Sequence, residues 1–247
     1  MKIIKEILGR VFAVWGIIWF VLTMLIFLIP FLLFSYFLKD PLKNIRFITM
    51  SRIWMKVFLN IVGCPLRVKG KENFKKGEAY IVICNHNSFM DVPISSPAIP
   101  GGNKTIAKAE LSKIPIFGLM YKTGSVLVDR KNETSRKESY TEMKRTLNMG
   151  LHMCIYPEGT RNTSKEPLKP FHDGAFKLAI NSGKSIIPAM IFYTRSILPS
   201  DKTFYFWPHP MEIHFLPPVQ PAAGETYQQL KEKAFTIMKD YYVANNH

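Results

Sequence analysis

The sequence predicts an α/β protein in which a mostly parallel sheet with flanking helices follows an N-terminal, membrane-embedded helical motif. After Pro65, short apolar segments alternate with longer mixed segments, and this alternation is typical of strands joined by helices in a parallel sheet. Before Pro65, residues 11–38 contain no charged side chain, and a run of about 18 apolar residues is enough for a membrane segment. We therefore divide the chain into a membrane-associated helical region, residues 1–62, and an α/β domain, residues 63–247.

The uncharged run at 11–38 would extend about 42 Å as one helix, against a hydrocarbon core of about 30 Å. Basic residues flank it on both sides: Lys2, Lys5 and Arg10 before it, and Lys39, Lys43, Arg46, Arg52 and Lys56 after it. Because positive charge favours the cytoplasmic side for both flanks, we expect a re-entrant helix pair folded near Pro30 rather than a tilted single span. A buried core hairpin with no membrane role is the third alternative.

Residues 44–62, the second part of this region, are predicted to form an amphipathic helix. Its polar residues recur at helical spacing, and apolar residues cover the rest of its surface; the polar set is Thr49, Arg52, Lys56 and Asn60. This pattern indicates a helix in the membrane interface with its basic stripe toward the lipid headgroups. The same pattern is compatible with a helix that packs on the α/β domain.

Seven strands and four helices are predicted in the α/β domain. The strands are expected near residues 65–69, 79–84, 104–107, 125–128, 151–156, 186–193 and 211–216. The helices are expected near residues 88–97, 133–149, 172–182 and 225–244.

The charge balance predicts anionic partners. Lys and Arg number 33 against 18 Asp and Glu, which gives a formal net charge of +15. Anionic lipid, acidic substrates and nucleic acid all fit such a balance, but nucleic acid is disfavoured because the basic residues flank apolar, membrane-seeking segments. The three scattered cysteines, Cys64, Cys84 and Cys154, form no CxxC pair, so neither a disulfide framework nor a metal site is predicted.

The strand expected near 79–84 ends in a polar segment that carries a candidate catalytic pair. His86 follows the strand, and Asp91 comes five residues later, where a helix is expected to begin. A histidine can take up a proton near neutral pH, and a carboxylate can hold its ring and stabilise its charged form. A structural interpretation is also open, because Ser88 and Asp91 match an S-x-x-D capping box.

Two later strands also end in polar loops that carry an arginine. Arg130 follows the fourth predicted strand, and the segment Pro157-Glu158-Gly159-Thr160-Arg161 follows the fifth. Ligands gather beyond the carboxyl ends of strands in open α/β sheets, so these loops can share one cleft with His86 if the strands are neighbours. The planar fork of arginine suits phosphate oxygens, and Gly159 lets the backbone approach a ligand closely.

Four blocks in this order resemble the motifs of the glycerolipid acyltransferases, and specifically of the 1-acyl-sn-glycerol-3-phosphate acyltransferase family. The blocks are Asn85-His86-Asn87-Ser88-Phe89-Met90-Asp91, Gly124 to Arg130, Pro157 to Arg161, and Ile187-Pro188-Ala189. They lie between residues 80 and 190. Four ordered motifs are far more specific than any one of them.

The resemblance implies an enzyme that moves an acyl chain from an acyl-ACP or acyl-CoA thioester to the sn-2 hydroxyl of lysophosphatidic acid. The product is phosphatidic acid, for phospholipid biosynthesis. By this resemblance His86 takes the hydroxyl proton and Asp91 orients its ring, with Asn85 and Asn87 as candidate oxyanion donors. The implied binding segment for the acceptor's phosphate is Glu158, Gly159, Thr160 and Arg161, in which Glu158 orients the loop or the arginine, with Arg130 and Lys108 as further candidates. No cofactor is implied.

The uncharged run, its basic flanks and the cytosolic donors that the resemblance implies together predict a location at the cell membrane, on an anionic surface, with the α/β domain on the cytoplasmic face. Three alternatives stay open. The acceptor can be glycerol-3-phosphate or another lysophospholipid, and the protein can be a non-catalytic one that binds anionic membranes. In the third alternative Cys84, two residues before His86, is the nucleophile of a Cys–His hydrolase.

Overall fold

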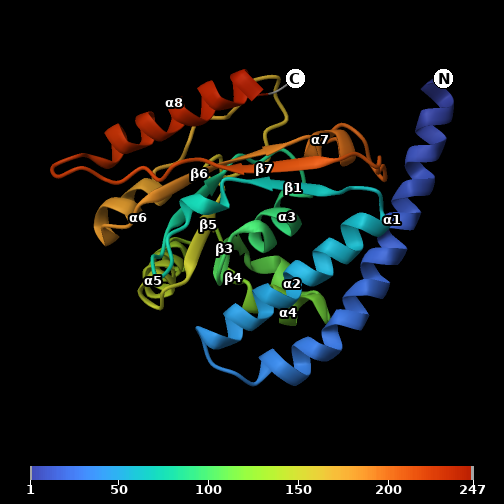
Figure 1. The fold of residues 1–247 in the computed structure, drawn as a ribbon, viewed down its shortest axis with the longest axis horizontal. Helices are drawn as coiled ribbons and strands as arrows, with labels where there is room; N and C mark the ends of the chain where they lie inside the picture. The colour runs from blue at the N-terminus through green and yellow to red at the C-terminus, as the bar shows by residue number, and fades with distance from the viewer. Residues whose placement is uncertain (1, 246–247) are drawn as a thin grey trace.

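A seven-stranded sheet forms the centre of the computed structural model, which describes residues 2–245 (Figure 1). The strand order is β1-β7-β6-β2-β5-β3-β4. The strands are β1 (Leu66–Lys69), β2 (Ile81–Cys84), β3 (Asn103–Lys108), β4 (Ser125–Val128), β5 (His152–Ile155), β6 (Ile186–Phe192) and β7 (Met211–Phe215). All neighbouring pairs are parallel except β6 and β7. The predicted α/β class with a mostly parallel sheet is therefore confirmed.

Helices cover both faces of this sheet (Figure 1). On one face lie α1 (Lys2–Phe31), α2 (Leu42–Ile61), α3 (Asp91–Ala98), α4 (Phe117–Thr123) and the short α7 (Thr194–Ile197). On the other lie α5 (Glu133–Asn148), α6 (Gly174–Ser182) and α8 (Tyr227–Asn245). The side chains of β2 show the division, because Val82 and Cys84 enter the first core whereas Ile81 and Ile83 enter the second.

The N-terminal region is a helical hairpin, but the expected reversal near Pro30 is wrong. Helix α1 contains Pro30 and continues into a π-helical turn at Leu32–Tyr36. The chain reverses only at residues 37–41 and returns as α2. Pro30 removes one helical hydrogen bond, but its apolar neighbours offer no polar side chain that could bond to the backbone if the helix broke there. In the observed reversal, by contrast, the Asp40 carboxylate pairs with the Lys104 ammonium of β3 at 2.7 Å.

Helix α1 packs mainly on α2, and its N-terminal half also contacts the α/β domain. The amide of Phe206 donates to the Gly9 carbonyl at 3.0 Å, and the Trp54 indole donates to the Thr23 hydroxyl at 2.9 Å. The opposite face of α1 is exposed and apolar; it includes Ile7, Val11, Val14, Ile18, Leu22, Leu25, Ile26 and Ile29. By length and composition, Ile3–Tyr36 could cross a membrane, with a mean hydropathy of 2.8.

Helix α2 packs on the α/β domain through one face, with Phe47, Ile48 and Phe58 buried. Arg52, expected to face lipid, instead turns toward the protein and donates to the carbonyls of Pro97, Ile99 and Gly101 behind α3. These carbonyls lie at the end of α3 and beyond it, where a guanidinium is favoured. Arg52 thus joins the hairpin to the helix that carries Asp91.

Candidate active site

The candidate residues gather at the edge of the sheet where the parallel strands end. β2 lies between β5 and β6 in the sheet, and β3 lies between β5 and β4. The loops that follow β2, β5 and β4, which carry His86, Arg161 and Arg130, therefore open on the same edge. The sequence predicted a shared cleft only if these strands lie close together in one sheet, and the strand order meets that condition.

Asp91 is fully buried at the start of α3, and its carboxylate accepts four hydrogen bonds. Oδ2 accepts from His86 Nδ1 at 2.8 Å and from the amides of Asn87 and Ser88 at 2.6 and 2.8 Å. Oδ1 accepts from the Thr194 hydroxyl at 2.6 Å. Asp91 thus both satisfies the loop amides, as a capping residue does, and holds the histidine ring, so the two interpretations are compatible.

The His86 side chain is 18% exposed, and its ring lies against Tyr156 with 4.5 Å between ring centroids. Within residues 2–245 the structure records no partner for Nε2, so this nitrogen is the one that a substrate can reach. The His86 backbone is fixed on both sides. Its amide donates to Glu158 Oε1 at 2.7 Å, and its carbonyl accepts from the amide of Asn162 at 2.6 Å.

Glu158 is buried and connects the loop after β2 to the loop after β5. Besides the His86 amide, it accepts from the Lys169 amide at 2.9 Å through Oε2. Burial raises the pKa of Glu158, and the two amide donors oppose that rise. Both carboxylate oxygens are used within the protein, so Glu158 orients the loops rather than presenting itself to a ligand.

Gly159 has a φ of +69°, and a Cβ at this position would lie 2.7 Å from the His172 ring. The loop after β5 can therefore turn tightly only with glycine here. The Gly159 carbonyl accepts from the Arg130 guanidinium, which brings the fourth strand's arginine onto this loop.

Arg161 stacks on Phe89, with 3.6 Å between its guanidinium carbon and the ring centroid. Phe89 is 69% exposed, so the pair lies at the surface beside the His86 loop. Lys169 donates to the Thr160 hydroxyl at 2.6 Å and adds a third cation to this region. Lys108 pairs with Glu110 at 2.6 Å, and among the described residues its ammonium forms no hydrogen bond or ion pair with the loop after β5.

Two of the residues weighed in the sequence turn out to be engaged elsewhere. The fully buried Asn85 side chain donates to the Ile191 carbonyl and accepts from the Ile191 amide, so it fastens the end of β2 to β6. Cys84 is fully buried, 3.9 Å from Cys154 Sγ. Its contact with Cys154 and its burial raise the pKa of the Cys84 thiol well above its usual range, which disfavours a thiolate nucleophile.

Thr194 and Arg195 are the site residues that the sequence analysis missed. Both follow β6, the strand on the other side of β2, so the rule that pointed to Arg130 and Arg161 applies to them as well. Thr194 contacts Asp91, and Arg195 donates to Asn87 Oδ1 at 3.2 Å and to the Asn162 carbonyl at 2.5 Å.

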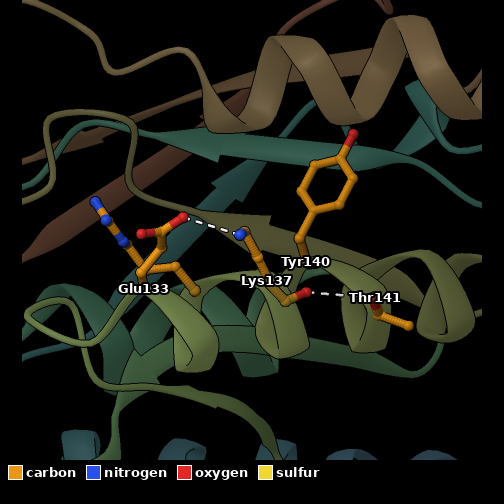
Figure 2. A pocket seen from close by; sticks show the side chains of 5 residues that line it. Glu133, Lys137, Tyr140 and Thr141 are labelled. Atoms are coloured by element: carbon orange, nitrogen blue, oxygen red, sulfur yellow. Dashed lines mark hydrogen bonds and ion pairs between the residues drawn. The ribbon is translucent and has the colours of Figure 1, made fainter.

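A surface hollow of about 490 Å³ lies elsewhere, along one side of α5 (Figure 2). Its lining consists of Glu133, Arg136, Lys137, Tyr140 and Thr141, and Glu133 and Lys137 form an ion pair there at 2.9 Å. None of these residues belongs to the loops around His86. Over residues 2–245 no group of three or more His, Cys, Asp or Glu residues is arranged to hold a metal ion.

Comparison with solved structures supports the fold. The crystal structure of the 1-acyl-sn-glycerophosphate acyltransferase PlsC from Thermotoga maritima superposes with a TM-score of 0.81. The alignment covers 98% of each chain at 20% sequence identity. At this identity the likeness establishes the shared fold.

Comparison with known sequences gives relatives and a family. A 1-acyl-sn-glycerol-3-phosphate acyltransferase from Cocos nucifera is 30% identical over 67% of this chain and 53% of its own length. The human 1-acyl-sn-glycerol-3-phosphate acyltransferase alpha is 29% identical over 74% of this chain and 65% of its own length. The chain thus spans about half to two thirds of these relatives. A family model described as Acyltransferase matches residues 65–192, which is more than half of the 247 residues. The match includes the loops that follow β2, β3, β4 and β5. The chain therefore belongs to the acyltransferase family.

Proposed function

We propose that the protein transfers an acyl chain from an acyl-ACP or acyl-CoA thioester to the sn-2 hydroxyl of lysophosphatidic acid, giving phosphatidic acid in phospholipid biosynthesis. The observation that carries the proposal is the His86–Asp91 pair, with Nδ1 and Oδ2 2.8 Å apart, in a histidine that is 18% exposed and whose backbone is bonded to the loop that carries Arg161. The choice of acceptor is supported by the relatives, which are named for 1-acyl-sn-glycerol-3-phosphate.

In the proposed reaction His86 acts as a general base. Nε2 accepts the proton of the acceptor's hydroxyl while that oxygen attacks the thioester carbonyl carbon and a C–O bond forms. When the tetrahedral intermediate collapses, the C–S bond breaks and the imidazolium returns the proton to the leaving thiolate. Asp91 holds the Nδ1–H tautomer and stabilises the imidazolium, as a carboxylate does in a catalytic triad. General-base catalysis of this kind contributes roughly 10²–10⁴-fold.

The loop after β5 is proposed to bind the acceptor's phosphate. Arg161 stacks through its face on Phe89, which leaves the N–H edges of its guanidinium available for phosphate oxygens. Thr160 and the backbone at Gly159 lie beside it, and Arg130 and Lys169 add positive charge at contact distance from this loop. Lys108 is the weakest of the proposed ligands because it is paired with Glu110.

The α1–α2 hairpin is proposed to hold the enzyme on the cytoplasmic face of the cell membrane. One face of α1 packs on α2 and, near its N-terminus, on the α/β domain, while the other face is exposed and apolar, which suits a re-entrant helix lying in one leaflet. The net charge of +15 favours an anionic surface, and both candidate donors are cytosolic molecules. In this arrangement residues 1–62 anchor the protein and residues 63–247 carry the chemistry.

A panel of acceptors and donors tests the proposal. The full chain in detergent micelles is given acyl-ACP or acyl-CoA with lysophosphatidic acid, glycerol-3-phosphate or lysophosphatidylcholine, and the lipid product is identified by mass spectrometry. We expect phosphatidic acid from lysophosphatidic acid with at least one donor. Turnover of another acceptor alone would change the assigned substrate, and no transfer to any acceptor would contradict the proposed function.

A further inference from the structure

We propose that Thr194 is a positioning residue for the catalytic pair: its hydroxyl fixes the plane of the Asp91 carboxylate, and thereby the tautomer and orientation of His86. The proposal rests on the proposed role of His86 as the base. Thr194 does not contact the ring itself, so it acts through Asp91.

The Thr194 hydroxyl donates to a different oxygen of Asp91 than the other three donors do. Oδ2 accepts from three donors, all within the segment from His86 to Ser88, whereas Oδ1 accepts from Thr194 at 2.6 Å. Both residues are fully buried, with 0% exposure. Water therefore has no open route to replace the hydroxyl, and a buried carboxylate oxygen without a donor is costly.

The two oxygens of a carboxylate move together, which is why a donor on Oδ1 matters for His86. Rotation about the bond to the carboxyl carbon would tilt Oδ2 out of the line to Nδ1. Donors on both oxygens resist that rotation from two sides of the group. Among these donors Thr194 is the one outside the His86 loop, and it lies 103 residues after Asp91 in the sequence.

The backbone before Thr194 is bent to bring the hydroxyl to this place. Tyr193 has a φ of +68°, a left-handed conformation that is unfavourable for a non-glycine residue. This turn ends β6 and begins α7 within one residue. Strain held beside a buried contact to a catalytic carboxylate is consistent with a positioning function.

Arg195, the next residue, forms hydrogen bonds from the same turn between β6 and α7 to the two neighbouring loops. It donates to Asn87 Oδ1 at 3.2 Å and to the carbonyls of Asn162 and Ser164 at 2.5 and 2.9 Å. The corner between β6 and α7 therefore contacts the catalytic carboxylate, the loop after β2 and the loop after β5.

Matched substitutions separate positioning from packing. Thr194→Val keeps the shape and removes the hydroxyl, Thr194→Ser keeps the hydroxyl, and Thr146→Val makes the same change at a buried threonine of α5 whose hydroxyl donates to the Glu142 carbonyl. We expect Thr194→Val to lower kcat about 10-fold with KM changed less than about 2-fold, the loss expected for a hydrogen bond to a charged group. Thr194→Ser and Thr146→Val should stay within about 2-fold of the wild type in both constants.

The tautomer of His86 gives a second readout that needs no turnover. In the full chain labelled with ¹⁵N-histidine in detergent, the His86 signals are assigned by their loss in His86→Ala. The wild type and Thr194→Ser should show the neutral Nδ1–H tautomer, whereas Thr194→Val should show a mixture with the Nε2–H form. If the wild type transfers no acyl chain, the proposed function fails while this spectrum still decides the role of Thr194.

The proposal is overturned if folded Thr194→Val keeps the wild-type kcat and tautomer, or if Thr146→Val lowers kcat as much. Folding is checked by the thermal unfolding midpoint. Should Thr194→Val not fold, Thr194→Ala in its place must lower kcat and shift the tautomer, and a wild-type result in both measurements contradicts the proposal.

Discussion

At the scale of single residues, the site contains two buried carboxylates with different surroundings. Asp91 accepts from a histidine ring, two amides and a hydroxyl, whereas Glu158 accepts from two backbone amides. The first arrangement suits a carboxylate that stabilises the positive charge of the imidazolium. The second suits a group that holds two loops together.

Asp91→Asn tests the first assignment. The amide keeps the shape but cannot accept from all the donors that Oδ2 and Oδ1 serve, and it no longer stabilises an imidazolium. We expect kcat to fall on the order of 10⁴-fold, as it does for this change in a catalytic triad. Steady-state kinetics on protein shown to be folded by circular dichroism measures it, and a loss below about 10-fold would contradict the assigned role.

Arg161 is expected to affect the acceptor rather than the chemistry. Replacing the guanidinium by the amide in Arg161→Gln removes a charge-assisted contact to phosphate, which corresponds to roughly a 10–100-fold increase in the KM for lysophosphatidic acid. The matched control is Arg145→Gln on α5, where the arginine pairs with Glu142 at the surface. Equal effects of the two substitutions would argue for long-range charge and against a specific phosphate contact.

The sequence predicted His86 and Asp91 because their partnership is local, five residues apart at a strand end. Thr194 could not be paired with Asp91 in this way, since only the position of β6 beside β2 brings them together. The Cys84 alternative failed for a related reason. Sequence spacing placed Cys84 and His86 on one side of an extended strand, but the strand ends at Cys84 and that thiol turns into the core.

At the scale of elements, the central strands were predictable because both faces of β2, β5 and β6 are buried, so β2 and β6 read as continuous apolar runs and β5 as an apolar run interrupted only by His152. Helices α4 and α7 were not predicted, because four to seven residues are too few to show a helical period. The reversal of the hairpin was misplaced because a proline signal was given more weight than the first charged residues beyond it, where Asp40 pairs with Lys104.

Strand β5 contains a histidine that should make stability depend on pH. Burial lowers the pKa of His152 to about 4, and its Nδ1 accepts from the Tyr80 amide at 3.0 Å. The unfolded chain binds a proton near pH 6.5 and the folded chain only near pH 4, so stability falls as the pH drops through this window. The expected loss between pH 7.5 and 4.5 is about 2–3 kcal/mol.

His152→Asn isolates this contribution, since the amide oxygen can accept from Tyr80 without titrating. Urea unfolding in detergent at pH 7.5 and 4.5 should show a smaller loss of stability for the variant than for the wild type. Equal losses in the two proteins would mean that His152 is not the group responsible.

At the scale of the whole molecule, the exposed apolar face of α1 and the net charge of +15 lie on one chain, and both favour an anionic membrane. Ile18→Glu and Ile26→Glu place a charge on that face, at side chains that are 48% and 62% exposed. Each should weaken binding to phosphatidylglycerol vesicles about 10-fold or more, because an isoleucine contributes about 1.5–3 kcal/mol when fully buried.

Val243→Glu on α8 is the matched control for vesicle flotation, since it changes an equally exposed apolar residue on the other layer of the fold. We expect it to bind as the wild type does. Binding lost equally in all three variants, or in none, would argue against α1 as the membrane-facing element.

The central claim is that His86 removes the acceptor's proton, and His86→Ala tests it most directly. Phosphatidic acid formation from lysophosphatidic acid is measured for the wild type and the variant, with both thioester donors and with thermal unfolding midpoints as the check on folding. The account predicts product from the wild type and a loss of at least about 10²-fold in kcat for the folded variant. Transfer at an undiminished rate by folded His86→Ala would contradict it.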